Sequence, residues 1–192
     1  LTSSKDNVVS QYSDASFVDG PMQKHINEGG KFEFPVGDAG RLGVLFVESA
    51  YTSVSSQIWE AAYYSKDASG DGYNTSDFAD PLKYVSKNEY WRLSGPAATP
   101  TTGDEAVVTV RWDEQSGISG NYGDLRVARW QSTEWQDDGD IHSGDTPSSG
   151  TLTTNSATGS LGDGLFTIAT TYLSNKEWVG GAGGAETTWA ET

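Results

Sequence analysis

The chain has 192 residues, a formal net charge of −15 and no cysteine. A negative charge of this size repels the phosphate backbone of nucleic acids and the anionic surface of membranes, which argues against both as partners. Without cysteine, disulfides, zinc–thiolate sites and cysteine nucleophiles are excluded, and no run approaches the roughly 20 apolar residues that a membrane-spanning helix needs.

The first part of the chain predicts strands separated by tight turns. Ser16 to Gly40 joins two turn-rich phrases, FVDGP and FPVGD, through a Gly-Gly loop. Leu42 to Ser49 is almost continuously apolar, which indicates a central strand. Ser55 to Tyr64 also fits a helical turn, but its paired aromatic residues favour a strand. Leu82 to Leu93 predicts a further strand with a break near Ser86 to Asn88.

The clearest strands follow in the second half of the chain. Glu105 to Trp112 alternates with period two, and Trp112 is expected in the core. Asp124 to Gln131 and Gly164 to Leu173 continue the pattern. Turn-forming residues cluster at 65–77, 94–104, 114–123, 137–150 and 155–164, which predicts loops there.

This spacing of short strands and turn clusters predicts an all-β fold, an antiparallel β-sandwich, with jelly-roll and immunoglobulin-like topologies both open. We expect one sandwich domain over residues 16–174. Residues 1–15 would form an extended N-terminal segment and residues 175–192 a glycine-rich tail. Because the chain begins at Leu1 and not at Met, we expect a processed or excised piece of a longer precursor.

One loop has the spacing of a calcium site. Asp67, Ser69, Asp71 and Asp77 place oxygen atoms at alternating positions around a glycine turn, and Ca²⁺ prefers six to eight oxygen ligands. The twelfth position is Phe78 where an EF-hand has glutamate, so another acid would have to complete the site. The alternative is a polar loop without metal.

A second acidic cluster covers residues 137–145 and contains His142, a candidate ligand for a transition metal. Its spacing matches no established ligand pattern, so a solvated loop is the favoured interpretation. His142 and His25 are the only histidines, and neither lies in a recognisable catalytic motif. We therefore predict that the chain is not an enzyme.

Five phrases in fixed order carry a family resemblance: FVDGP, FPVGD, EYWRL, VVTVRW and GDLRVARW. Over residues 16–169 the chain resembles a module of large exported surface proteins of Bacteroidota, the gliding-motility and adhesin class that the type IX secretion system exports. The resemblance implies an extracellular β-sandwich and supplies no catalytic residues.

Two departures from the family pattern stand out. Arg41-Leu42-Gly43 replaces a phrase that usually carries an aromatic residue and a proline. The chain also ends in NKEWVGGAGGAETTWAET where family members continue into a sorting domain that is cleaved after export. Either that domain was removed, or this branch uses another ending.

The tail predicts a contact with a partner. A Gly-Ala stretch is preceded by Trp178 and Val179 and followed by Trp189. An extended end of this kind can add as a strand to a partner's sheet while its tryptophans fill pockets. Repeated head to tail, this contact would build a filament. The leading hypothesis is thus an extracellular structural or adhesive module that self-associates through its terminal segments.

The alternative hypothesis is a carbohydrate-binding module. Trp59, Trp130 and Trp135 lie on or beside predicted strands, and an exposed indole face can stack on a sugar ring while polar neighbours fix its orientation. The competing interpretation is that most of these tryptophans belong to the core.

Overall fold

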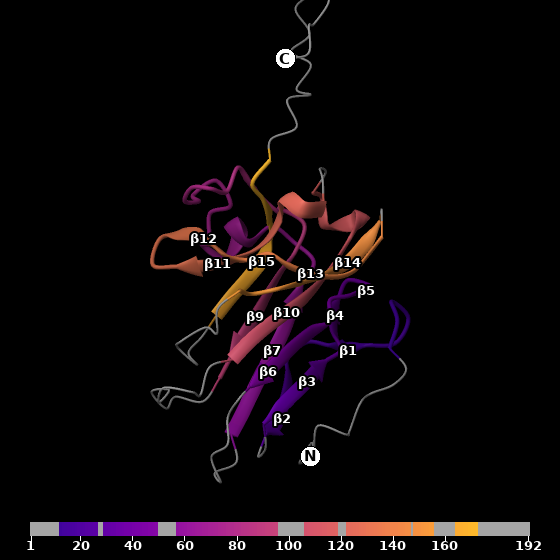
Figure 1. Cartoon of the computed structure of the whole chain (residues 1–192). Helices are drawn as coiled ribbons and strands as arrows, with labels where there is room; N and C mark the ends of the chain where they lie inside the picture. Colours follow the sequence, from indigo (N-terminus) through magenta and orange to yellow (C-terminus); the bar gives the residue numbers. More distant parts are fainter. Residues whose placement is uncertain are drawn as a thin grey trace, which may run out of the picture.

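The protein is described by a computed structural model over residues 12–26, 29–49, 57–95, 106–118, 122–146, 148–155 and 164–172. Within these residues every regular element is a β-strand or a short 3-10 turn, and two large antiparallel sheets pack against each other (Figure 1). The predicted all-β sandwich is therefore confirmed.

The smaller of the two sheets has five strands in the order β13-β14-β10-β6-β3, and every pairing is antiparallel. Strand β6 pairs on both sides, which confirms the central position predicted from its apolar sequence. The five strands are β3 (Gly30–Phe34), β6 (Leu45–Ser49), β10 (Ala106–Asp113), β13 (Ile141–Thr146) and β14 (Ser149–Thr153).

The larger sheet runs in the order β12-β11-β15-β9-β7-β2, and β8 pairs with β15 beyond the end of β9. Strands β8 and β9 lie one after the other along β15, so the predicted strand with a break near Ser86 is confirmed. The strands are β2 (Met22–Ile26), β7 (Gln57–Tyr64), β8 (Tyr84–Val85), β9 (Tyr90–Ser94), β11 (Leu125–Gln131), β12 (Glu134–Gly139) and β15 (Gly164–Thr170).

A third, small sheet orders β1-β4-β5, in which β1 runs parallel to β4. It comprises β1 (Val18–Asp19), β4 (Val36–Asp38) and β5 (Arg41–Leu42). Three 3-10 turns complete the described chain: η1 (Ala68–Asp71), η2 (Glu114–Ser116) and η3 (Tyr122–Asp124).

The chain passes from one large sheet to the other at both sides of the sandwich. On one side β2, at the edge of the larger sheet, leads directly into β3 at the edge of the smaller sheet. On the other side β12 leads into β13 through Asp140 alone. Each side of the sandwich is therefore joined covalently by neighbouring edge strands.

The main core lies between the two large sheets. Alternate residues of the facing strands fill it, among them Phe34 and Val110 from the smaller sheet and Trp59, Trp91 and Ile168 from the larger sheet. Trp112 is buried in the same core, as predicted. Burial of these apolar and aromatic side chains provides the main driving force for folding.

A second apolar cluster lies on the outer face of the larger sheet. Ala68 and Leu82, from the segment between β7 and β8, cover Tyr90, Ala128 and Trp135 on the sheet. Phe78 forms a parallel bridge to Trp135, so this segment also runs along the edge strand β12. One part of the larger sheet is therefore buried on both faces.

The prediction of a loop over residues 137–150 is wrong, because β12 continues to Gly139 and β13 and the start of β14 follow. The turn-forming residues of this stretch are held as strands by the ladder with β10, in which Gly150 lies opposite Trp112 and Leu152 opposite Val110. Leu152 is fully buried and anchors this part of the sheet.

Candidate functional site

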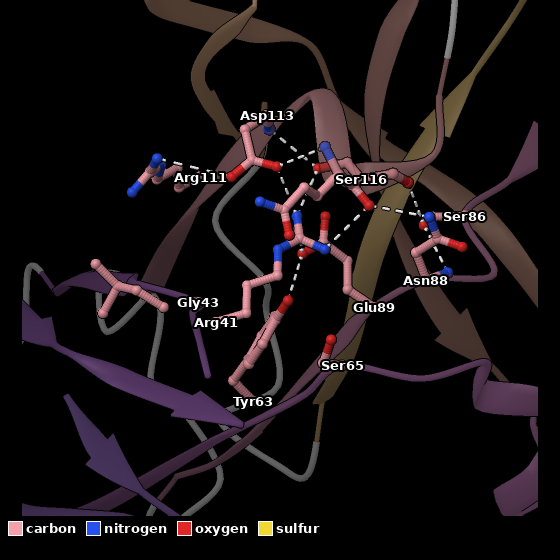
Figure 2. A network of polar contacts seen from close by, with 12 residues as sticks. Arg41, Gly43, Tyr63, Ser65, Ser86, Asn88, Glu89, Arg111, Asp113 and Ser116 are labelled. Carbon is pink, nitrogen blue, oxygen red and sulfur yellow. Dashed lines mark hydrogen bonds and ion pairs between the residues drawn. The ribbon is translucent and has the colours of Figure 1, made fainter. Parts of the chain in front are cut away.

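The most concentrated polar chemistry of the described chain surrounds Arg41 on β5. Four segments converge on its guanidinium group: β7, the link between β8 and β9, the end of β10 and the turn η2 (Figure 2). These segments carry Tyr63, Glu89, Asp113 and Ser116. We call these four residues and Arg41 the Arg41 cluster.

The guanidinium of Arg41 is engaged from several directions. Its Nη2 atom lies 2.8 Å from Asp113 Oδ1, 3.0 Å from Glu89 Oε2 and 3.2 Å from Ser116 Oγ, and Nη1 donates to the Gln115 carbonyl at 3.1 Å. Arg41 is 7% exposed and Glu89 is 1% exposed. The ion pairs are therefore shielded from water. Such contacts are stronger in the protein interior than at the surface.

The turn η2 is built to present two of these partners. Asp113 caps the turn by accepting from the Gln115 backbone N–H at 2.8 Å, and Ser116 Oγ accepts from the Asp113 backbone N–H at 3.0 Å. The same cap residues thus satisfy free backbone donors and receive Arg41. Ser86 Oγ donates to the Ser116 carbonyl at 2.6 Å and connects the turn to the break between β8 and β9.

Burial changes the protonation equilibria of the cluster. Desolvation raises the pKa of Glu89, while Arg41 and the hydroxyl groups of Ser116 and Tyr63 oppose that rise. Burial also raises the pKa of Tyr63, whose hydroxyl donates to Glu89 Oε2 at 2.9 Å. Tyr63 therefore acts as a hydrogen-bond donor to the carboxylate.

The tyrosine ring rests directly on the backbone of Gly43. A Cβ atom at Gly43 would lie only 2.0 Å from the Tyr63 ring, so no larger residue fits without a shift. The Gly43 carbonyl also accepts from Trp91 Nε1 at 2.9 Å. The Arg41-Leu42-Gly43 phrase therefore supplies both the cation of the cluster and the close backbone approach beneath it.

The arrangement joins parts of the chain that are distant in sequence. Its charged groups face one another and not solvent, and the Glu89 backbone carbonyl accepts from Thr167 on β15 at 2.6 Å. The geometry supports a bracing role, in which a buried cation connects the small sheet to both large sheets.

Sequence reasoning missed this cluster because its members lie far apart along the chain. One signal was available: Arg41 is a charged residue directly before the almost continuously apolar stretch from Leu42 to Ser49. A second was Glu89 directly before the buried strand β9. Neither position identifies the other without the three-dimensional fold.

The predicted calcium ligands lie together in the segment around η1, each with contacts of its own. Asp67 caps η1 and accepts from the Ser69 backbone N–H at 2.8 Å, and the Asp71 carboxylate pairs with Lys66 at 2.7 Å. Asp77 accepts from Asn74 at 2.9 Å. Among the described residues, no group of three or more acidic, histidine or cysteine side chains is placed to hold a metal ion.

Calcium binding by this loop stays a prediction. Binding would raise the melting temperature in proportion to the logarithm of calcium concentration above the dissociation constant. A melting temperature that does not change in millimolar calcium would refute the site.

The second acidic cluster is spread over β12 and β13. Arg126 lies between Asp137 and Asp140, with nitrogen–oxygen distances of 3.4 and 3.7 Å. Asp138 is the extra residue of a β-bulge against β11, and burial raises its pKa to about 6. His142 is half-buried on β13 and His25 lies on β2 in the other sheet, so the two histidines occupy different sheets.

The structure separates the three tryptophans of the carbohydrate hypothesis. Trp59 is 1% exposed and Trp135 is fully buried, so the expectation that they present a ring face to a sugar is wrong. Trp59 fills the main core, and Trp135 lies beneath the segment that covers the larger sheet. Trp130 is half-buried and contacts Trp135 and Tyr73 edge to face.

The predicted partner contacts Trp178, Val179 and Trp189 lie outside the described residues, as does the N-terminal segment before Tyr12. Within the described part of the chain no helix has the length and apolar character required to cross a membrane. No protein-family model, curated protein or solved structure matches the chain.

Proposed function

We propose that the chain is a structural module of an extracellular surface that associates with neighbouring copies through its terminal segments. The observation that carries the proposal is the bracing by the Arg41 cluster, which connects all three sheets without any cysteine. A module with such internal connections keeps its shape when it is joined to neighbours. The family resemblance of five ordered phrases supports the extracellular location.

The positions at which the described chain begins and ends support serial association. Near the start, the Tyr12 hydroxyl donates to Glu33 on β3, in the smaller sheet. Beyond β15, the Thr171 backbone N–H donates to the Asp124 carbonyl at 2.9 Å, beside the larger sheet. The described residues next to the two terminal segments thus contact different sheets, which supports separate attachment of two neighbours.

The net charge determines what kind of contact can hold the copies together. Modules with a charge of −15 repel one another over a distance that salt shortens to about 8–10 Å at physiological ionic strength. Association therefore requires short-range apolar contacts, which Trp178 and Trp189 can supply. We expect assembly to increase with salt concentration.

The test compares the full chain with its Trp178→Ala/Trp189→Ala variant by electron microscopy and light scattering. We expect the wild-type chain to assemble and the double variant to remain monomeric. Thr187→Ala/Thr188→Ala, which alters the same segment and spares both tryptophans, should assemble like the wild type. Unchanged assembly after deletion of residues 176–192 would refute the proposal.

A second candidate function, carbohydrate binding, is favoured by the environment of Trp130. Its ring lies 5.4 Å from that of Trp135 and 5.6 Å from that of Tyr73, which hold it in place while it remains partly exposed. Exposed Asn74 and Asp77 lie on the loop that carries Tyr73. A fixed aromatic face beside polar groups suits a sugar ring.

A glycan array separates the two functions. Carbohydrate binding requires selective retention of a sugar that is lost in Trp130→Ala and kept in Tyr172→Ala, which removes an exposed aromatic side chain elsewhere. Absence of selective binding by the wild-type chain would remove this candidate and leave the structural proposal intact.

A further inference from the structure

A lysine points into the core from an edge strand. Lys24 on β2 lies opposite Trp59 on the inner face of the larger sheet and is 4% exposed. Its ammonium nitrogen lies 5.5 Å from the ring centroid of Phe34 on β3. Burial lowers the pKa of Lys24, and nearby Glu33 partly opposes that change. An apolar residue would avoid this desolvation cost.

The position of Lys24 coincides with the side where two sheet edges meet. Strand β2 is an edge of the larger sheet and β3 is an edge of the smaller sheet, and the two follow each other in the chain. Among the described residues β2 pairs only with β7, and β3 pairs only with β6. Backbone donors and acceptors on such edges are templates for pairing with another chain.

The other edges are protected by different means. Along β12, the Trp135 backbone pairs with the Asp77 carbonyl and the Ala79 N–H, at 2.8 and 2.9 Å. Strand β13 is interrupted by an irregularity between Ser143 and Thr146, which disturbs the regular edge that an added strand would need. The β2 edge has neither of these features within the described residues.

We infer that Lys24 keeps the β2 edge closed to strand addition by a second copy of this chain. An added strand would cover this side of the sandwich and complete the burial of the ammonium group, which lies against Phe34 between the two edge strands. Removing the last access of a charge to water is unfavourable unless a counter-charge accompanies it. A second copy, which has the same β2 sequence, brings another lysine to that edge.

The inference concerns β2 and is independent of the proposed association through the terminal segments. It is therefore tested in the full-length chain that carries Trp178→Ala and Trp189→Ala, so that association through the tail does not contribute. In this background Lys24→Met replaces the charge with an apolar side chain of similar length. Lys24→Arg keeps the charge, and Lys87→Met removes a charge from an exposed loop.

Light scattering and hydrogen exchange give the two readouts. We expect Lys24→Met to shift the molar mass from monomer to dimer or larger species and to slow exchange of the backbone amides of residues 22–26. Lys24→Arg and Lys87→Met should remain monomeric with fast exchange at β2. If Lys24→Met does not fold, Lys24→Gln carries the same expectation. A folded, uncharged variant that stays monomeric with unchanged β2 exchange would overturn the inference.

Discussion

Replacement of Arg41 by methionine tests the bracing role of the Arg41 cluster. The substitution removes the partner of the Glu89 carboxylate, which is 1% exposed, and the hydrogen bonds to Ser116 and Gln115. Loss of one partner from a buried ion pair costs about 3–5 kcal/mol, because the other charge remains without compensation. At roughly 2–4 °C for each kcal/mol in a chain of this size, the melting temperature should fall by about 6–20 °C.

Urea unfolding followed by tryptophan fluorescence measures this loss, and Arg111→Met is the matched control. Arg111 contacts the same carboxylate, Asp113, but at 3.6 Å and with 37% of its side chain exposed. Exposed pairs contribute about 0–1 kcal/mol, so the control should lie close to the wild type. A loss in Arg41→Met no larger than in Arg111→Met would refute the bracing role.

The pH dependence of Arg41→Met gives a second check. Arg41 lowers the pKa of Glu89, so its removal raises that pKa further above the ordinary value. A carboxyl group whose folded pKa is raised binds its proton more strongly in the folded state, and stability therefore falls as pH rises through that pKa. We expect the difference in the free energy of unfolding between wild type and Arg41→Met to become smaller in mild acid. Glu89→Gln in the Arg41→Met background should restore part of the lost stability at neutral pH.

Two further predictions concern packing and charge. Gly43→Ala should destabilise the protein by about 1–3 kcal/mol in urea unfolding, because its Cβ would overlap the Tyr63 ring. Gly70→Ala is the control and should be nearly neutral, because no atom lies within 4 Å of the added Cβ. The raised folded pKa of Asp138 favours its protonated form, so the wild type should lose stability as pH rises from the ordinary pKa of 3.8 to about 6. Asp138→Asn should make this loss of stability smaller. Asp19→Asn controls for the charge change, and an equal effect there would contradict the role of burial.

Period-two alternation and turn clusters predicted the sandwich well where strands carry large apolar side chains. Strands β10 and β11 lie within one residue of their expected ranges, β15 begins as expected at Gly164 and ends at Thr170, and the interruption after β8 lies where the polar residues predicted it. Strand β13 escaped prediction because its inward position is His142, and its pairing with β14 depends on a ladder that no local signal encodes.

The Arg41 cluster could not be predicted from the sequence, for a physical reason. Glu89 and Asp113 meet Arg41 only because the fold brings the β8–β9 link and the end of β10 within 3.0 Å of the guanidinium group on β5. In a chain with 27 acidic residues, the sequence does not indicate which of them are buried. The tryptophans illustrate the same limit, since Trp130 and Trp135 lie opposite each other on neighbouring strands, yet Trp135 is fully buried and Trp130 only partly.

The passage from β12 to β13 through Asp140 makes the spacing of this corner critical. Side chains alternate between the two faces of a strand, so a shift of one position exchanges every inward and outward residue. Ile141 is 51% exposed, and His142 faces inward opposite Leu152. With one linking residue there is no loop to absorb a length change. Insertion or deletion of a single codon at this corner would turn Ile141 inward and His142 outward.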